Sequence, residues 1–401
     1  MNELASLGLI LLFALFAGHI VKFLHVPEVT GYIGAGILVG PYVLGWLTHD
    51  NLDTLEVFSE VALGLILFSI GSVFEFSRMR ASGRAMASVV LTESTLAATL
   101  VTGGMIVAGQ SWPVALLLGV VAIETAAAST MMVMRECNSQ GPLTETLTGV
   151  IGMNNVLCLF SFSIVAAILE ISAGSRETAG WYAIYSSVYP LIWQIVGSIA
   201  LGFLVGVLLA AWSTHVVEKG ETLILLAGCV LLCVGVSHVL QLSPLIATLT
   251  VGATMVNLSA ESRRLFEALG QTDPPLYAII FVIAGADLNI GLLATLGVLG
   301  VIYVVARSSA KLVGPWLGSR GFDITPSVRN RLGFAMLSQA GLAIGLTITI
   351  GARFPDLAPV VNTIVLSAVV IFELIGPLSA RLVLVRSGEA HDPPPLIDRA
   401  F

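Results

Sequence analysis

The chain has 401 residues, of which 56% are hydrophobic and only 11% are charged. Soluble domains carry roughly 25% charged residues, so this sequence has too little polar chain to cover a water-soluble fold of its size. The formal net charge of −7 is spread over the segments between apolar runs and therefore indicates no nucleic-acid partner.

The apolar residues come in runs of roughly 20, the length that crosses a bilayer as an α-helix. Outer-membrane barrels instead show segments of about ten residues with alternating hydrophobicity, so the fold class is an all-α membrane protein. The partner of most of its surface is then the lipid bilayer. The runs and the Gly and Pro breaks between them predict about thirteen transmembrane helices, at residues 3–23, 28–47, 55–74, 85–109, 113–136, 143–171, 187–213, 221–240, 243–258, 273–291, 293–316, 327–352 and 357–385.

The distribution of basic residues gives this layout an orientation. With the N-terminus outside, the alternate loops place 14 of the 18 Lys and Arg residues on the inner side, because Arg176 and Arg353 fall outside and Arg307 and Lys311 fall within a span. Cytoplasmic loops are enriched in Lys and Arg. We therefore expect a multi-pass protein of the inner (plasma) membrane, with its N-terminus outside and its C-terminus in the cytoplasm.

An odd number of spans allows two six-span units of opposite orientation joined by one linker helix. We expect the first inverted repeat at 1–171, the linker region at 172–220, the second repeat at 221–386 and a short cytoplasmic tail at 387–401. The fifth span of each unit is polar or glycine-rich in mid-membrane, at 124–130 and at 338–345. Paired interrupted helices in corresponding positions mark the substrate site of many transporters.

Two basic and two amide side chains lie within predicted spans, where a polar group needs a partner or a purpose. Lys311 lies one turn after Arg307, and a buried lysine can lose its proton and regain it when a carboxylate approaches. This behaviour suits proton coupling, although a structural salt bridge is the alternative. Asn154 and Asn155 stand in the middle of the sixth span; their carbonyls can bind Na⁺ or K⁺, but an amide carries no proton at physiological pH.

Three carboxylates complete the polar set. Glu124 lies in the first interruption, where it could bind a cation or form a structural hydrogen bond. Glu373 lies in the last span and could pair with Lys311 or Arg307 or contribute to the site. Glu93 lies in the fourth span, and for it we expect a structural or lipid-interface role.

Nothing in the chain indicates an enzyme or a bound cofactor. The four cysteines read as apolar helix fillers, and no zinc-protease, serine-nucleophile or nucleotide-binding motif stands in a suitable context. The sequence therefore favours a secondary transporter whose only small partners are the ions that it carries.

Four segments together resemble the monovalent cation:proton antiporters, in the branch of Kef-type and bacterial sodium/proton antiporters. They are 26–41, 60–71, 307–314 and 338–346, and the likeness covers nearly the whole chain. The resemblance implies exchange of Na⁺ or K⁺ for H⁺ and a core domain with two crossed, discontinuous helices. It also implies that this core moves like an elevator against a dimerisation domain, and that the protein is a homodimer.

The resemblance also assigns the ion site. Lys311 matches the family's basic residue, the Thr125–Thr130 segment matches the break in the fifth span, and the family's acidic site falls on Asn154 and Asn155. The predicted ion-binding and coupling residues are Glu124, Thr125, Ser129, Asn154, Asn155, Lys311 and Glu373, with Arg307, Gln339 and Thr130 in support. Of these, Asn154, Asn155 and Glu124 are the expected ligands of the monovalent cation.

Asparagines where the family has its proton-carrying aspartate leave four explanations open. The carboxylate has moved to Glu124, or Lys311 carries the proton while the asparagines and Glu124 bind the cation. Alternatively, Asp-to-Asn changes trap one state, or the protein has lost coupling and acts as a uniporter or facilitator. A non-transporting sensor is a further hypothesis.

Overall fold

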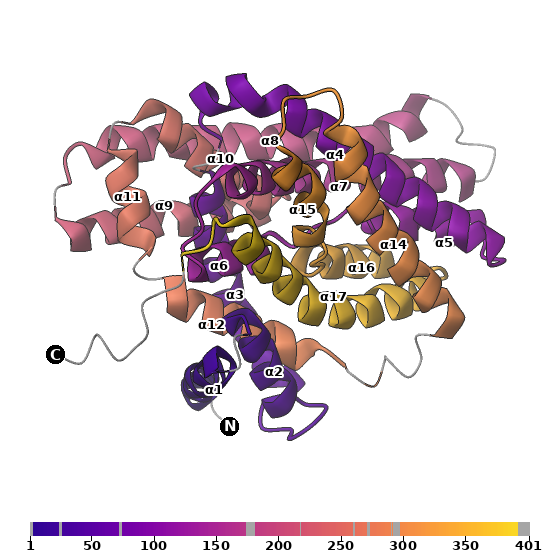
Figure 1. Ribbon diagram of the computed structural model, residues 1–401, viewed down its shortest axis with the longest axis horizontal. Coiled ribbons are helices and arrows are strands. Elements are labelled where there is room, and N and C mark those ends of the chain that lie inside the picture. The colour runs from indigo at the N-terminus through magenta and orange to yellow at the C-terminus, as the bar shows by residue number, and fades with distance from the viewer. Residues whose placement is uncertain are drawn as a thin grey trace.

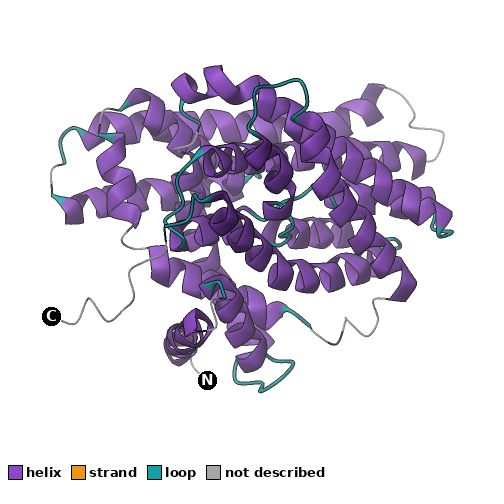
Figure 2. Cartoon of the chain, viewed as in Figure 1, coloured by secondary structure: helices purple, strands orange, loops and turns teal. Residues whose placement is uncertain are grey.

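The computed structural model describes residues 3–23, 26–71, 74–173, 181–216, 218–259, 261–270, 273–289, 291 and 297–391. Within these ranges the chain is helical and contains no strand (Figure 2). The helices are α1 (Glu3–Phe23), α2 (Glu28–Val39), α3 (His49–Gly71), α4 (Phe76–Val107), α5 (Trp112–Val121), α6 (Ala127–Glu136), α7 (Pro142–Ala173), α8 (Trp181–Ser213), α9 (Lys219–Val239), α10 (Pro244–Leu258), α11 (Ser262–Gly270), α12 (Asp273–Asp287), α14 (Gly297–Gly318), α15 (Pro326–Ala335), α16 (Gly341–Arg353) and α17 (Ala358–Ser387).

The all-helical membrane class is confirmed. Each predicted span coincides with one helix or with two consecutive half-helices, and 7 of the described helices are long and apolar enough to cross a membrane by length and composition. The count of thirteen spans and the boundaries of the two units stay predictions. Residues 174–180 of the predicted linker region and 392–401 of the predicted tail lie outside the described residues.

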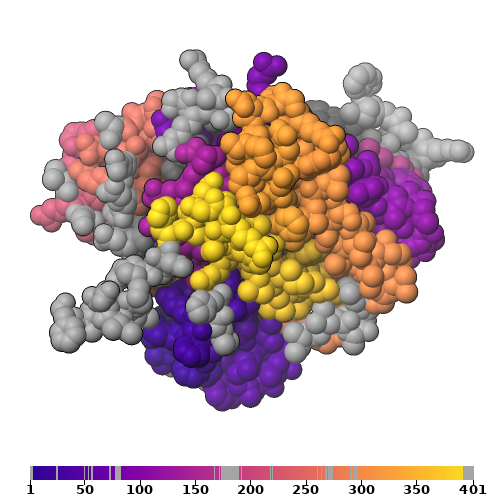
Figure 3. All heavy atoms as spheres, viewed as in Figure 1, coloured from indigo at the N-terminus to yellow at the C-terminus, as the bar shows by residue number. Residues whose placement is uncertain are grey.

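The helices sort into two bundles by their contacts. The scaffold bundle contains α1, α2, α3 and α8 to α12, and the crossover bundle contains α4 to α7 and α14 to α17. The most extensive contacts between the bundles run from α2 to α6 and α17, from α3 to α6, and from α7 to α8. The space-filling view shows α17, in yellow, lying between the orange helices of the crossover bundle and the indigo N-terminal helices (Figures 1 and 3).

Glycines set the closest helix contacts of the scaffold bundle. A Cβ atom on Gly36 of α2 would lie 2.1 Å from the carbonyl oxygen of Val282 in α12, and one on Gly252 of α10 would lie 2.0 Å from that of Phe68 in α3. Only a residue without a side chain permits such an approach. The second helix of each predicted unit thus packs on the third helix of the other, which is the pattern expected of two related units.

Both predicted interruptions are present in the crossover bundle. The backbone leaves the helix at 122–126, between α5 and α6, and at 336–340, between α15 and α16. These two non-helical segments, 122–126 and 336–340, are called the links below. They lie side by side, and the N–H of Ala126 in the first donates to the carbonyl oxygen of Ser338 in the second at 3.1 Å. Non-helical backbone at membrane depth persists only where protein or a water-filled cavity satisfies it, and here each link partly satisfies the other.

Candidate ion site

Arg307 holds the two links together. Helices end in carbonyl groups that lack an intrahelical partner and carry partial negative charge. The guanidinium donates to the carbonyl oxygens of Leu337 (2.7 Å), Ser338 (3.1 Å) and Glu124 (2.7 Å), and its carbon lies 4.3 Å from the centre of the Phe372 ring. Arg307 is fully buried, and its hydrogen bonds go to carbonyl oxygens at the carboxyl ends of α5 and α15.

Lys311 lies one turn further along α14 and is also fully buried. Its Nζ atom donates to the carbonyl oxygen of Ile123 at 2.6 Å and to Oγ1 of Thr125 at 2.7 Å. It also forms an ion pair with Oε1 of Glu93 at 2.8 Å, and neither side chain of that pair is exposed. All three ammonium protons therefore have an acceptor.

Glu93 also sets the orientation of Asn154. The Nδ2 atom of Asn154 donates to Oε2 of Glu93 at 2.8 Å and to Oγ of Ser94 at 3.2 Å. An ionised carboxylate only accepts hydrogen bonds, so the amide nitrogen must face Glu93 and the carbonyl oxygen must face away. This Oδ1 atom is buried and has no hydrogen-bond partner.

Glu124 and Glu373 each lie at the amino end of a half-helix. Oε2 of Glu124 accepts the N–H of Ala340, directly before α16, at 3.3 Å. Oε1 of Glu373 accepts the hydroxyl of Ser129, in the first turn of α6, at 3.2 Å, while its Oε2 atom is buried without a partner. Amino ends of helices favour negative charge, and both carboxylates use one.

The structure therefore brings most of the predicted site residues together but changes their partners. Sequence reasoning offered Lys311 or Arg307 as the partner of Glu373; the structure pairs Glu373 with Ser129 and Lys311 with Glu93. Glu93 was expected to be structural or interfacial, and it is the residue that the sequence analysis missed.

Two supporting residues have local roles. Gln339 donates from Nε2 to the carbonyl oxygen of Val121, at the end of α5, at 3.1 Å, and to the hydroxyl oxygen of Tyr303 at 2.9 Å. Thr130 donates to the carbonyl oxygen of Ala126 at 3.0 Å. Gln339 thus caps the end of α5, while Thr130 satisfies the backbone at the start of α6.

Asn155 faces a different direction from Asn154, towards the scaffold bundle. It lines a cavity of about 40 Å³ together with α3 and α10, whose contributions there are leucine and isoleucine side chains. Its Oδ1 atom is buried without a hydrogen-bond partner. Such a volume is large enough for one water molecule, and the residues around it place the cavity at the boundary between the bundles.

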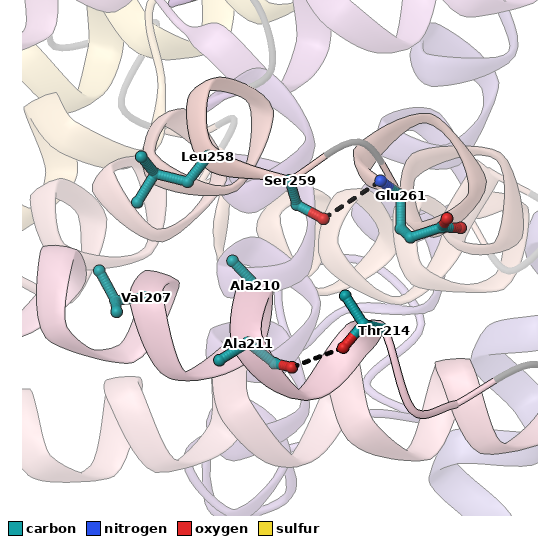
Figure 4. A pocket seen from close by; sticks show the side chains of 7 residues that line it. All are labelled: Val207, Ala210, Ala211, Thr214, Leu258, Ser259 and Glu261. Carbon is teal, nitrogen blue, oxygen red and sulfur yellow. Dashed lines mark hydrogen bonds between the residues drawn. The ribbon is translucent and has the colours of Figure 1, made fainter.

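A larger cavity, of about 330 Å³, lies away from the crossover, against α8 and α10 (Figure 4). Its polar groups are already engaged. Thr214 donates to Ala211, Ser259 accepts the N–H of Glu261, and the Glu261 carboxylate lies 3.4 Å from Arg264. We assign it no part in ion binding.

Comparison with known proteins agrees with this geometry. Residues 8–386 match the family model described as sodium/hydrogen exchanger, transmembrane. The structure is similar to that of the sodium proton antiporter MjNhaP1 from Methanocaldococcus jannaschii at pH 8, with a TM-score of 0.71 at 16% identity over 96% of this chain and 98% of that one. A three-dimensional electron microscopy map of the same antiporter gives a TM-score of 0.72 at 16% identity over 96% of this chain and 94% of that one. With its crossed half-helices, buried charges and a family match along nearly its full length, the chain belongs to the transmembrane sodium/hydrogen exchanger family, whose members are transporters and not enzymes.

Proposed function

We propose that this protein exchanges a monovalent cation, Na⁺ or K⁺, for a proton at the crossover of the two broken helices. The observation that carries the proposal is the charge of that site. Among the described residues of the crossover bundle, the charged side chains that are at most 2% exposed are three carboxylates, Glu93, Glu124 and Glu373, and two bases, Arg307 and Lys311. With every group ionised, one negative charge remains in excess.

An uncompensated charge in a low-dielectric interior costs several kcal/mol. One proton on a carboxylate removes that cost, and so does one monovalent cation bound beside it. Either ion satisfies the site, and both together would leave it with an excess positive charge. H⁺ and the cation therefore compete for one site. If that site opens to each side of the membrane in turn, the result is exchange, and this charge count gives one proton per cation.

The surplus belongs to Glu124 and Glu373. Glu93 is paired with Lys311. Arg307, whose guanidinium donates to the backbone carbonyl oxygen of Glu124 and to no carboxylate, is the one buried base left to balance the two remaining carboxylates. Of these two, Glu373 has an oxygen without any partner, so we place the exchangeable proton there or shared with Glu124. The cation is then held by oxygens of the predicted set at the crossover, namely Glu124, Thr125, Ser129, Asn154 and Glu373, whereas Asn155 faces the cavity at the boundary between the bundles. Lys311 acts as a counter-charge.

Movement follows from the two bundles. Their most extensive contacts involve a few helices, and the cavity at Asn155 lies on their boundary. We propose that the crossover bundle moves against the scaffold bundle like an elevator and exposes the site to each side. The basic residues favour a plasma-membrane protein with its N-terminus outside, and a homodimer is what the family resemblance implies.

Proteoliposomes with an internal pH-sensitive dye test the proposal. Adding Na⁺ or K⁺ outside should move protons outward through the wild-type protein, whereas Glu373→Gln and Glu124→Gln should each abolish this movement. The proposal is wrong if the wild type shows no cation-dependent proton movement at any pH from mildly acidic to alkaline. Cation flux that ignores the pH gradient and persists in Glu124→Gln would instead show an uncoupled facilitator, which the neutral amide of Asn155 would suit.

A further inference from the structure

Glu93 is held opposite Lys311 by the closest approach between α4 and α14. A Cβ atom on Gly314 would lie 2.5 Å from the Cα atom of Glu93, and one on Gly318 would lie 2.7 Å from the Cα atom of Val89. Gly314 and Gly318 are one helical turn apart, as are Val89 and Glu93, so the two backbones meet along a full turn. Lys311 precedes this contact by three residues on α14, which fixes the depth at which it meets Glu93.

Both members of the pair are fully buried among polar neighbours. Glu93 uses Oε1 for Lys311 and Oε2 for Asn154, while Lys311 also donates to Ile123 and Thr125. Loss of the ammonium proton would leave a buried carboxylate unpaired and remove donors from the end of α5. Unpaired buried charges are among the most costly defects in a protein, so the pairing with Glu93 opposes release of that proton, against the opposite effects of burial and of the neighbouring Arg307 charge.

We propose that Glu93 is a positioning residue of the ion site: it holds Lys311 as a permanent cation against the end of α5 and turns the carbonyl of Asn154 away from α4. Lys311 then carries no exchangeable proton during transport. The inference rests on the proposed exchange function and deepens it, because it assigns the proton to the carboxylates Glu124 and Glu373.

The net charge of the site in three variants distinguishes Lys311 as a fixed counter-charge from Lys311 as a proton carrier. Glu93→Gln alone removes the surplus negative charge of the site, and Lys311→Met alone doubles it. The double variant removes one charge of each sign and leaves the surplus unchanged. If Lys311 is a fixed counter-charge, the double variant keeps the condition for exchange that each single variant loses.

The experiment measures cation-driven proton movement for the two single variants and the double variant in proteoliposomes. Each single variant should fall about a hundredfold or more, because a buried partner is left unpaired, whereas the double variant should recover to within about tenfold of wild type. Its pH profile should match the wild type. The ionisable groups around Lys311 are Glu93 of α4, Arg307 of α14, Glu124 of the link and Cys158 of α7, and of these only Glu93 is changed.

An ion pair outside the site provides matched control variants. Glu170 and Arg353 form an exposed pair between α7 and α16 at 2.9 Å; Glu170→Gln, Arg353→Met and their combination should leave exchange unchanged. If the single variants fail to fold, judged by gel filtration and thermal unfolding, the double variant decides alone.

A folded double variant as inactive as the single variants would overturn the inference, as would single variants with wild-type exchange or a shifted pH profile in the double variant. Each of these results requires an active wild type. A wild type without exchange would instead remove the proposed function on which the inference rests.

Discussion

Gly314→Ala perturbs the contact on which the site depends by adding one carbon atom. The added Cβ would lie 2.5 Å from Cα, 3.0 Å from Cβ and 3.2 Å from the nitrogen of Glu93. Carbon atoms pack at about 3.5–4.0 Å, so α4 and α14 must separate by about 1 Å. The obstacle is backbone and cannot rotate away.

Two opposing contributions determine how much Gly314→Ala changes the free energy of unfolding. Overpacking a close-packed interior costs about 1–3 kcal/mol, and replacing a helical glycine with alanine returns up to about 1 kcal/mol. The net destabilisation is about 1–2 kcal/mol, which raises the unfolded fraction by about five- to thirtyfold. Separation of the helices also lengthens the 2.8 Å ion pair between Lys311 and Glu93, so exchange should fall more than stability does.

Thermal unfolding in detergent and exchange in proteoliposomes measure the two effects. Gly235→Ala is the matched control: Gly235 lies within α9, and a Cβ there meets nothing within 4 Å. The control should be as stable as wild type or slightly more stable, with unchanged exchange. If Gly314→Ala behaves like Gly235→Ala in both assays, the contact does not position Glu93 and the reasoning is wrong.

Further predictions concern charge and the helix ends. Asn155→Asp adds a second buried negative charge, so transport should become electrogenic, which a voltage-sensitive dye detects; unchanged electroneutral exchange would contradict the charge count. Glu136 of α6 accepts the N–H of Glu28, the first residue of α2, at 2.8 Å, and Pro27 provides no side-chain cap; Glu136→Ala should therefore raise deuterium exchange at the Glu28 amide by about tenfold or more. Glu389 accepts the N–H of Thr144 at 2.8 Å, in the first turn of α7, so Glu389→Ala should destabilise the protein by about 1–2 kcal/mol in thermal unfolding, and an unchanged transition would show that the cap is dispensable.

Most of the fold is predictable from the sequence because hydrocarbon imposes a simple rule. Every backbone polar group must be satisfied within the segment, so long apolar runs form helices. The interruptions were also visible, since 124–130 and 338–345 place polar or glycine residues at mid-membrane depth. The bounds of the interruptions could not be predicted. The links occupy 122–126 and 336–340, and the residues that marked the interruptions partly belong to the first turns of α6 and α16.

The sequence alone could not predict which side chains of the site pair with one another. A buried lysine requires a carboxylate, but Glu93, Glu124 and Glu373 all qualified, and their distances along the chain do not rank them. The choice depends on which helices meet, and α4 meets α14 because glycines at 314 and 318 remove the side chains between them. A search for small residues one turn apart beside Lys311 would have favoured a close helix contact there, although it would not have named α4 as the partner helix.

The asparagines of the predicted sixth span lack the proton-carrying carboxylate of the family resemblance, and the proposed charge count explains how exchange can proceed without it. What coupling requires is one unit of negative charge in excess at a site that both sides can reach, because that surplus accepts one proton or one cation. The position of the carboxylates is secondary to their number, provided that each base is matched. Here Glu93 matches Lys311 from α4, which leaves Glu124 and Glu373 to share the charge of Arg307. Coupling should therefore survive any rearrangement that preserves the surplus, and any single substitution that changes the surplus should either abolish exchange or change the net charge moved per cycle.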